Sequence, residues 1–161
     1  MLWSAPPAST GAACYAGFGD KRGLFLESLR RYDRRQREEF LARLAERHTP
    51  REAILAAFDA AAHGAQGAPG GCLLVNTALE VSPHDAQVRE LVNSALAAVR
   101  GFFRDMVRQG QQAGELSTTL DAEETAEALL GLFLGLRVLH RSEADPAMRE
   151  AVASRARTLL E

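Results

Sequence analysis

Apolar residues recur three and four positions apart along most of the chain, which is the spacing of amphipathic helices. Turn-forming residues divide this pattern into five long segments and two short ones. The predicted helices span about residues 20–47, 49–63, 86–110, 121–140 and 146–160, with short ones at 72–81 and near 10–16. The pattern therefore predicts a domain built by packing helices against one another.

Four of these helices begin at a residue that suits a helix N-terminus. Asp20, Thr49, Asp121 and Asp145 each offer a side-chain oxygen to the first free backbone N–H groups. Proline follows Thr49 and Asp145, at the first helical position, where its missing N–H has no cost. The glycine-rich segment from Gly64 to Gly71 predicts a loop. It does not have the pattern of a phosphate-binding loop, because no strand precedes it and no Lys-Ser pair follows it.

Composition supports the helical prediction. The 161 residues include 29 Ala and 22 Leu but only 8 Val and 1 Ile, whereas a sheet would favour β-branched residues. A hydrophobic content of 47% excludes a globally disordered chain. The longest apolar run, Ala128 to Leu136, is too short to cross a bilayer, and the first residues do not resemble a signal peptide. We expect a cytoplasmic protein with no membrane partner.

The net charge of −2 is unevenly distributed. Residues 20–51 hold ten basic and six acidic side chains, so this part carries +4 and the remainder −6. A basic front favours contact with phosphates. The alternative, which we favour for the arginines beyond Arg31, is a solvated helix with ion pairs such as Asp33–Arg37 and Arg35–Glu39.

No catalytic or metal-binding set is visible in the sequence. The four histidines lie mostly at predicted helix ends, and His63 with Cys72 is too small a set for zinc. No serine follows the strand–turn–helix pattern of a hydrolase nucleophile. We therefore expect neither an enzyme nor a cofactor, although a small helical enzyme stays as a distant alternative.

The segment Tyr15-Ala16-Gly17-Phe18-Gly19-Asp20-Lys21 followed by Leu24-Phe25 resembles the end of the DNA-binding region in tetracycline-repressor (TetR) family transcriptional regulators. Residues 71–80 and 131–139 resemble the ligand-binding and dimerisation helices of the same family, and the resemblance covers roughly residues 9–160. It implies a remnant of a helix-turn-helix domain at 1–19, a connecting helix at 20–47, and an effector-binding and dimerisation domain at 48–161.

The resemblance implies operator contacts through the short segment around Tyr15. The candidate DNA-binding residues are Thr10, Gly11, Ala13, Tyr15, Ala16 and Lys21. Only nine residues precede this segment, where the family has two full helices, so we expect an incomplete helix-turn-helix. Two hypotheses stay open: a repressor that responds to a small molecule, and a DNA-incompetent homodimer or heterodimer partner that binds a ligand. On residue types alone, Tyr15 and Phe18 would only hold a short helix against the core.

Two further sets of residues are candidates for a dimer interface and a ligand pocket. Gly131 and Gly135 share one helix face, which indicates either a dimer interface or a tight internal crossing; the resemblance favours a homodimer. The candidate interface residues are Gly131, Leu132, Gly135, Leu136, Leu139 and Val152. The candidate pocket for a small organic effector is Phe58, Leu74, Asn76, Phe102, Phe103 and Met106. The alternative for the aromatic and methionine side chains is plain core packing.

Overall fold

The computed structural model describes residues 20–64 and 72–161, and within these ranges it is built of helices and turns with no strand. The all-α class predicted from the Ala and Leu excess is confirmed. The helices are α2 (Lys21–Arg35), η1 (Gln36–Leu41), α3 (Ala42–Arg47), α4 (Pro50–His63), α5 (Leu73–Glu80), α6 (Ala86–Gln112), α7 (Ala122–Arg141) and α8 (Pro146–Thr158).

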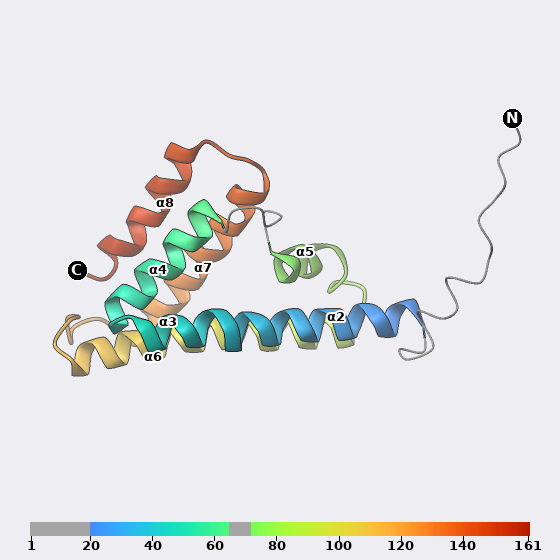
Figure 1. The fold of residues 1–161 in the computed structure, drawn as a ribbon, viewed down its shortest axis with the longest axis horizontal. Helices are drawn as coiled ribbons and strands as arrows, with labels where there is room; N and C mark the ends of the chain where they lie inside the picture. The colour runs from blue at the N-terminus through green and yellow to red at the C-terminus, as the bar shows by residue number, and fades with distance from the viewer. Residues whose placement is uncertain (1–19, 65–71) are drawn as a thin grey trace, which may run out of the picture.

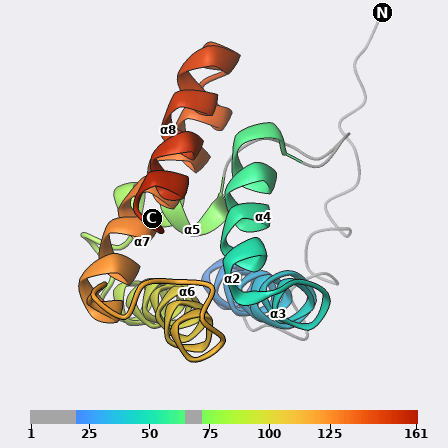
Figure 2. The same cartoon turned by 90° about the vertical axis from the view of Figure 1, so that its left-hand side faces the viewer.

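Two long helical rods form the base of the molecule. The first is the uninterrupted run of α2, η1 and α3, and the second is α6, which lies alongside it (Figures 1 and 2). Helices α4, α7 and α8 rise from one end of these rods, and α5 lies beside α2 and α6. The sequence predicted one regular α-helix from 20 to 47, but η1 is a π-helical turn, which changes the direction in which the following side chains face.

The four predicted N-caps are confirmed by their hydrogen bonds. Asp20 accepts a hydrogen bond from the backbone N–H of Gly23 at 2.7 Å, and Asp121 caps α7 in the same way. Thr49 forms a reciprocal capping box with Glu52. Because such caps depend on neighbours in the sequence, the helix starts could be predicted without knowledge of tertiary contacts.

The apolar side chains form two separate clusters. The α7 cluster lies between α4, α6, α7 and α8, and the α2 cluster lies between α2, α5 and α6. The fully buried members of the α7 cluster include Ile54, Phe58, Phe103, Val107, Leu129 and Leu136, and those of the α2 cluster include Leu29, Val88, Val92 and Ala95. The long helices cross both clusters and so connect them.

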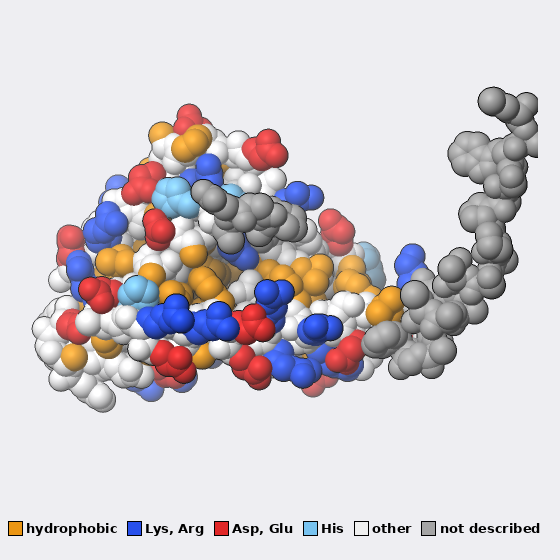
Figure 3. Space-filling model, viewed as in Figure 1, with side chains coloured by type: hydrophobic (Ala, Val, Ile, Leu, Met, Phe, Trp, Pro, Cys, Tyr) orange, Lys and Arg blue, Asp and Glu red, His pale blue; other side chains and the backbone are white. Residues whose placement is uncertain are grey.

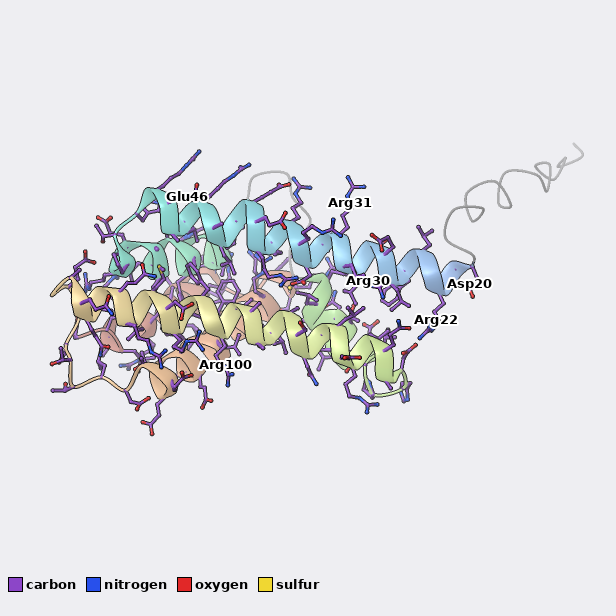
Figure 4. The ribbon with its side chains drawn as sticks, turned by 90° about the horizontal axis from the view of Figure 1, so that it is seen from below. Asp20, Arg22, Arg30, Arg31, Glu46 and Arg100 are labelled. Carbon is purple, nitrogen blue, oxygen red and sulfur yellow. The ribbon has the colours of Figure 1, made fainter. Side chains whose placement is uncertain are left out.

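A bidentate ion pair joins the starts of the two rods. Arg22 donates to both carboxylate oxygens of Asp85, at 2.9 and 3.1 Å, and also to the side-chain oxygen of Gln87 at 3.0 Å. Figure 4 shows Arg22 pointing from α2 toward the start of α6. Asp85 also caps α6 through the backbone N–H groups of Gln87 and Val88. The Arg22 guanidinium is the main reason that the pKa of Asp85 lies below its usual value, and the cap adds to it.

Gly64 ends α4 with a backbone conformation that other residues rarely adopt. Its φ of 71° and ψ of 172° lie in a region that is essentially limited to glycine. A Cβ atom at this position would also lie 2.6 Å from Nε2 of His140. The predicted helix stop at this residue is therefore explained by a steric requirement.

We expect Gly64→Ala to lower the free energy of unfolding by about 1–2 kcal/mol, because the strained backbone and the contact with His140 both oppose it. Gly114→Ala is the matched control, since Gly114 also has a positive φ of 74° but no atom within 4 Å of the added Cβ. Urea denaturation of both variants should show the larger loss at Gly64. Equal losses would mean that the His140 contact has no effect.

Candidate functional site

The six residues predicted to line a pocket lie in two different places. Phe58, Phe103 and Met106 are buried in the α7 cluster, and Phe102 packs against its edge. Leu74 belongs to the α2 cluster. The side chain of Asn76 is exposed on α5. The structure therefore separates these six residues into a core group and a group near α5.

Three phenylalanines from three helices form the centre of the α7 cluster. The ring centroids of Phe58, Phe103 and Phe133 lie 5.7–6.0 Å apart, and two of the three pairs meet edge to face. Phe102 adds a further edge-to-face contact with Phe103 at 5.5 Å. Edge-to-face pairs are a preferred arrangement of aromatic rings, so this group holds α4, α6 and α7 together.

Three polar side chains near the boundary of the two clusters are joined by hydrogen bonds, and the charge of a fourth, Arg137, acts on one of them; we call the four the Arg137 cluster: Tyr32, Gln36, Cys72 and Arg137. The Tyr32 hydroxyl accepts a hydrogen bond from Nε2 of Gln36 at 3.1 Å and donates one to Sγ of Cys72 at 3.7 Å. The guanidinium of Arg137 lies 6.0 Å from the centroid of the Phe133 ring. The hydrogen bonds thus connect α2 and η1 to the residue before α5, and Arg137 of α7 acts on this group through its charge.

The electrostatics of this cluster are set by burial and by its one cation. Burial is the main reason that the pKa of Tyr32 lies above the usual 10.0, and Cys72 raises it further. The charge of Arg137 acts in the opposite direction. Sequence reasoning did not select Tyr32 or Arg137 as site residues. Arg137 was nevertheless visible as the one charged residue in the apolar run from 128 to 139.

We expect alkaline pH to destabilise the wild type more than Tyr32→Phe. Because the folded pKa of Tyr32 is raised, the folded chain retains a proton that the unfolded chain loses above pH 10.0. The contribution is complete below the unfolded pKa and is lost as pH rises through the folded pKa. Urea denaturation at pH 8 and at higher pH should show the steeper decline in the wild type; parallel declines would contradict the assignment.

Helices α7 and α8 present an uncovered apolar face, which we call the α7/α8 face. It holds a shallow groove lined by Ala128, Gly131, Leu132, Arg155, Thr158 and Leu159. No atom lies within 4 Å of a Cβ built at Gly131 or Gly135. Val138, seven residues after Gly131, is 46% exposed. The two glycines therefore do not serve a tight crossing within the described part of this subunit.

The predicted interface residues differ in their access to solvent. Gly131 is exposed, whereas Leu132, Gly135, Leu139 and Val152 are half-buried. Leu136 is fully buried in the α7 cluster, so its side chain faces the interior of this subunit. Gly131 and Gly135 thus lie on the side of α7 that the described part of this subunit leaves uncovered. Leu136 lies on the side that packs into the α7 cluster.

The predicted DNA-binding residues lie outside the described part of the chain, except for Lys21. Lys21 is exposed at the first position of α2. Farther along the helix, Figure 3 shows basic and acidic side chains side by side on the exposed surface. Both predicted ion pairs, Asp33–Arg37 and Arg35–Glu39, are present. For Arg35 and Arg37, the interpretation as a solvated, paired face is confirmed.

No group of three or more His, Cys, Asp or Glu side chains in residues 20–64 and 72–161 is arranged to hold a metal ion. Within the same ranges, no helix is both long enough and apolar enough to cross a membrane.

Comparison with known proteins identifies the relatives of this fold. Residues 49–156 match the family described as "Tetracyclin repressor-like, C-terminal domain". The chain is 28% identical over 143 residues to the HTH-type transcriptional repressor ComR of Escherichia coli K12, covering 85% of this chain and 68% of that protein.

Solved structures agree with the sequence matches. A cysteine mutant of the TetR family transcriptional regulator CifR, complexed with a 26-bp operator DNA, is 28% identical with a TM-score of 0.76; the match covers 90% of this chain and 77% of that one. A TetR family regulator from Cytophaga hutchinsonii is 21% identical with a TM-score of 0.83, covering 94% and 76%, and supports the fold.

The fold and its relatives place this chain among the all-α transcriptional regulators. The chain belongs to the tetracycline-repressor (TetR) family, and the match to the family's C-terminal domain covers more than half of its length.

Proposed function

We propose that this protein is a cytoplasmic, homodimeric transcriptional regulator whose affinity for operator DNA is controlled by a small organic effector. The observation that carries the proposal is the α7/α8 face. An apolar groove with two open glycines, on a chain of this family, is a surface that a second copy would cover by close approach of helix backbones.

The proposal of DNA binding rests on the relatives and on charge. The solved CifR structure is a complex with operator DNA, and ComR is named a transcriptional repressor. In the present chain, the basic balance of residues 20–51 and the exposed Lys21 at the start of α2 suit contact with phosphates. These contacts would position the regulator on DNA, whereas contacts to base edges would determine the operator sequence.

Coupling between the effector and DNA would pass through the long helices. Helix α2 carries Lys21 at one end and Tyr32 of the Arg137 cluster three turns later. The Arg22–Asp85 pair joins this end of α2 to α6, so the two helices would shift together. An effector that binds one arrangement of these helices better than another would thereby change the affinity for DNA.

Two measurements on the purified full chain test this function. Light scattering should give twice the 17.4 kDa mass of one chain, and a monomer at micromolar concentration would contradict the dimer. Fluorescence anisotropy with genomic fragments, selected by repeated rounds of binding, should detect a complex that weakens at least about tenfold between 50 and 200 mM salt. A dimer without salt-dependent binding would instead support the DNA-incompetent alternative.

A further inference from the structure

Arg137 is a cation without a counterpart in the described part of the chain. It lies in the apolar run of α7, and its Nε–H group is buried without a hydrogen-bond acceptor among the described residues. Nor does any described carboxylate form an ion pair with its guanidinium. A buried donor without an acceptor costs free energy, and the cost is larger when the group is charged. Such a group is therefore expected to have a partner that the described residues do not supply.

Arg149 shows how an arginine with a structural role differs. Its Nε is also buried without an acceptor, but its Nη1 donates to the backbone oxygen of Ala62 and to Nδ1 of His140, the latter at 2.9 Å. These bonds tie α8 to the ends of α4 and α7. Arg137 makes no comparable bond within the described residues, so structural anchoring does not explain its charge.

The second donor of the cluster is also weakly engaged. The Tyr32 hydroxyl donates a hydrogen bond to the sulfur of Cys72 at 3.7 Å, and thiol sulfur is a weak acceptor. The oxygen of Tyr32 also accepts a hydrogen bond from Gln36. A stronger acceptor placed near Cys72 would therefore replace the sulfur as the acceptor of the Tyr32 hydrogen bond, with little loss of free energy. The Arg137 cluster thus offers two polar donors, one of them cationic, and lacks an anion.

Apolar side chains surround these donors. The ring of Phe133 lies beside the Arg137 guanidinium and continues into the Phe58–Phe103 group. On the other side, Cys72 and Tyr32 pack against the α2 cluster. A ligand that satisfied Arg137 and Tyr32 would accordingly need an apolar body next to its charged group.

We propose that the Arg137 cluster binds the carboxylate of a small apolar carboxylic acid, and that this acid is the effector. One carboxylate oxygen accepts hydrogen bonds from Arg137, the other accepts a hydrogen bond from the Tyr32 hydroxyl, and the apolar body lies toward Phe133. A single cation matches a singly charged carboxylate better than a phosphate, which carries up to two charges and is bound by several basic groups. This proposal rests on the proposed function, since it names the chemical class of its effector.

Binding at this place would change how α2 is held. Without ligand, Tyr32 of α2 bonds to Cys72, immediately before α5; with ligand, it bonds to an anion held by α7. The acceptor of the Tyr32 hydrogen bond thus changes from the residue before α5 to an anion bound by α7. The end of α2 that carries Lys21 lies on the same helix, which connects the site to the proposed DNA contact.

The test compares matched acids and amides on the full chain. Benzoate, phenylacetate and octanoate are titrated beside benzamide, phenylacetamide and octanamide, with inorganic phosphate as a further probe, by calorimetry and by thermal unfolding. We expect at least one acid to raise Tm by about 3 °C or more at saturation, and its amide to bind at least about tenfold more weakly. Phosphate should not bind.

Three variants relate the binding to the cluster. Arg137→Met should weaken the acid at least about tenfold while leaving Tm of the free protein unchanged or higher, because it removes a partly buried cation whose Nε–H has no acceptor among the described residues. Tyr32→Phe should weaken the acid less. Arg141→Met is the matched control, since Arg141 lies on α7 but is exposed, and it should bind the acid like the wild type.

Several outcomes would overturn the carboxylate proposal. These are binding of no acid, equal binding of an acid and its amide, binding of phosphate alone, or unchanged affinity in Arg137→Met. Binding of amides alone would overturn the ligand class but leave an effector site in place. The dimer and DNA measurements above do not use these ligands, so failure of the proposed function is detected separately.

Discussion

Phe103→Ala is expected to lower the free energy of unfolding by about 3–5 kcal/mol. Phe103 is fully buried and its ring contacts three other phenylalanine rings, from α4, α6 and α7. Truncation would remove the burial of the ring and leave a cavity that the surrounding helices cannot fill. Since domains are stable by only about 5–15 kcal/mol, a large fraction of the variant would unfold on moderate heating.

Phe102→Ala provides the comparison, because Phe102 is the adjacent residue of the same type but is only half-buried. We expect it to lose about half as much stability, in proportion to the smaller area that it buries. Urea denaturation followed by circular dichroism measures both variants. Equal losses would show that Phe103 does not lie at the centre of the α7 cluster.

Gly131→Arg is expected to convert the proposed homodimer into a folded monomer. In the single subunit the position is open, with no atom within 4 Å of an added Cβ, so the arginine does not disturb the fold. Between two close helix backbones, however, the side chain would collide with the partner and place two like charges near each other. The dissociation constant should rise at least about 100-fold, measured by analytical ultracentrifugation.

Ala97→Arg is the control for the added charge, because Ala97 is exposed on α6 and does not belong to the α7/α8 face. It should remain dimeric with the wild-type dissociation constant. A Gly131→Arg variant that dimerises like the wild type would exclude the α7/α8 face as the dimer interface. The dimer would then have to form through another surface.

The helices were predictable because their signals are local. An aspartate or threonine followed by an apolar repeat determines where a helix starts, and Gly64 determines where α4 ends. The π-helical turn at Gln36–Leu41 was not predictable in this way, since its residues are ordinary helix formers. It is compatible with the packing of α2 and α3 on two different clusters, which is a tertiary effect.

The Arg137 cluster was beyond sequence reasoning because its members are far apart in the chain. Tyr32 and Cys72 are 40 residues apart, and only the folded arrangement of α2, α5 and α7 brings them near Arg137. The pocket prediction relied on residue type instead, and it combined core phenylalanines with the exposed Asn76. On α7, apolar on nearly every side, the sequence could not separate the open Gly131 from the buried Leu136.

Under the proposed function, the continuous helix from Lys21 to Arg47 would act as a lever arm. At about 1.5 Å per residue it is about 40 Å long, and its far end turns directly into α4 and the rigid aromatic group. A tilt of about 5° around that fixed end displaces Lys21 by about 3.5 Å, close to the 3.4 Å spacing of nucleotides along one DNA strand. If effector binding tilted the helix in this way, Lys21 would shift by about one nucleotide along the proposed DNA contact.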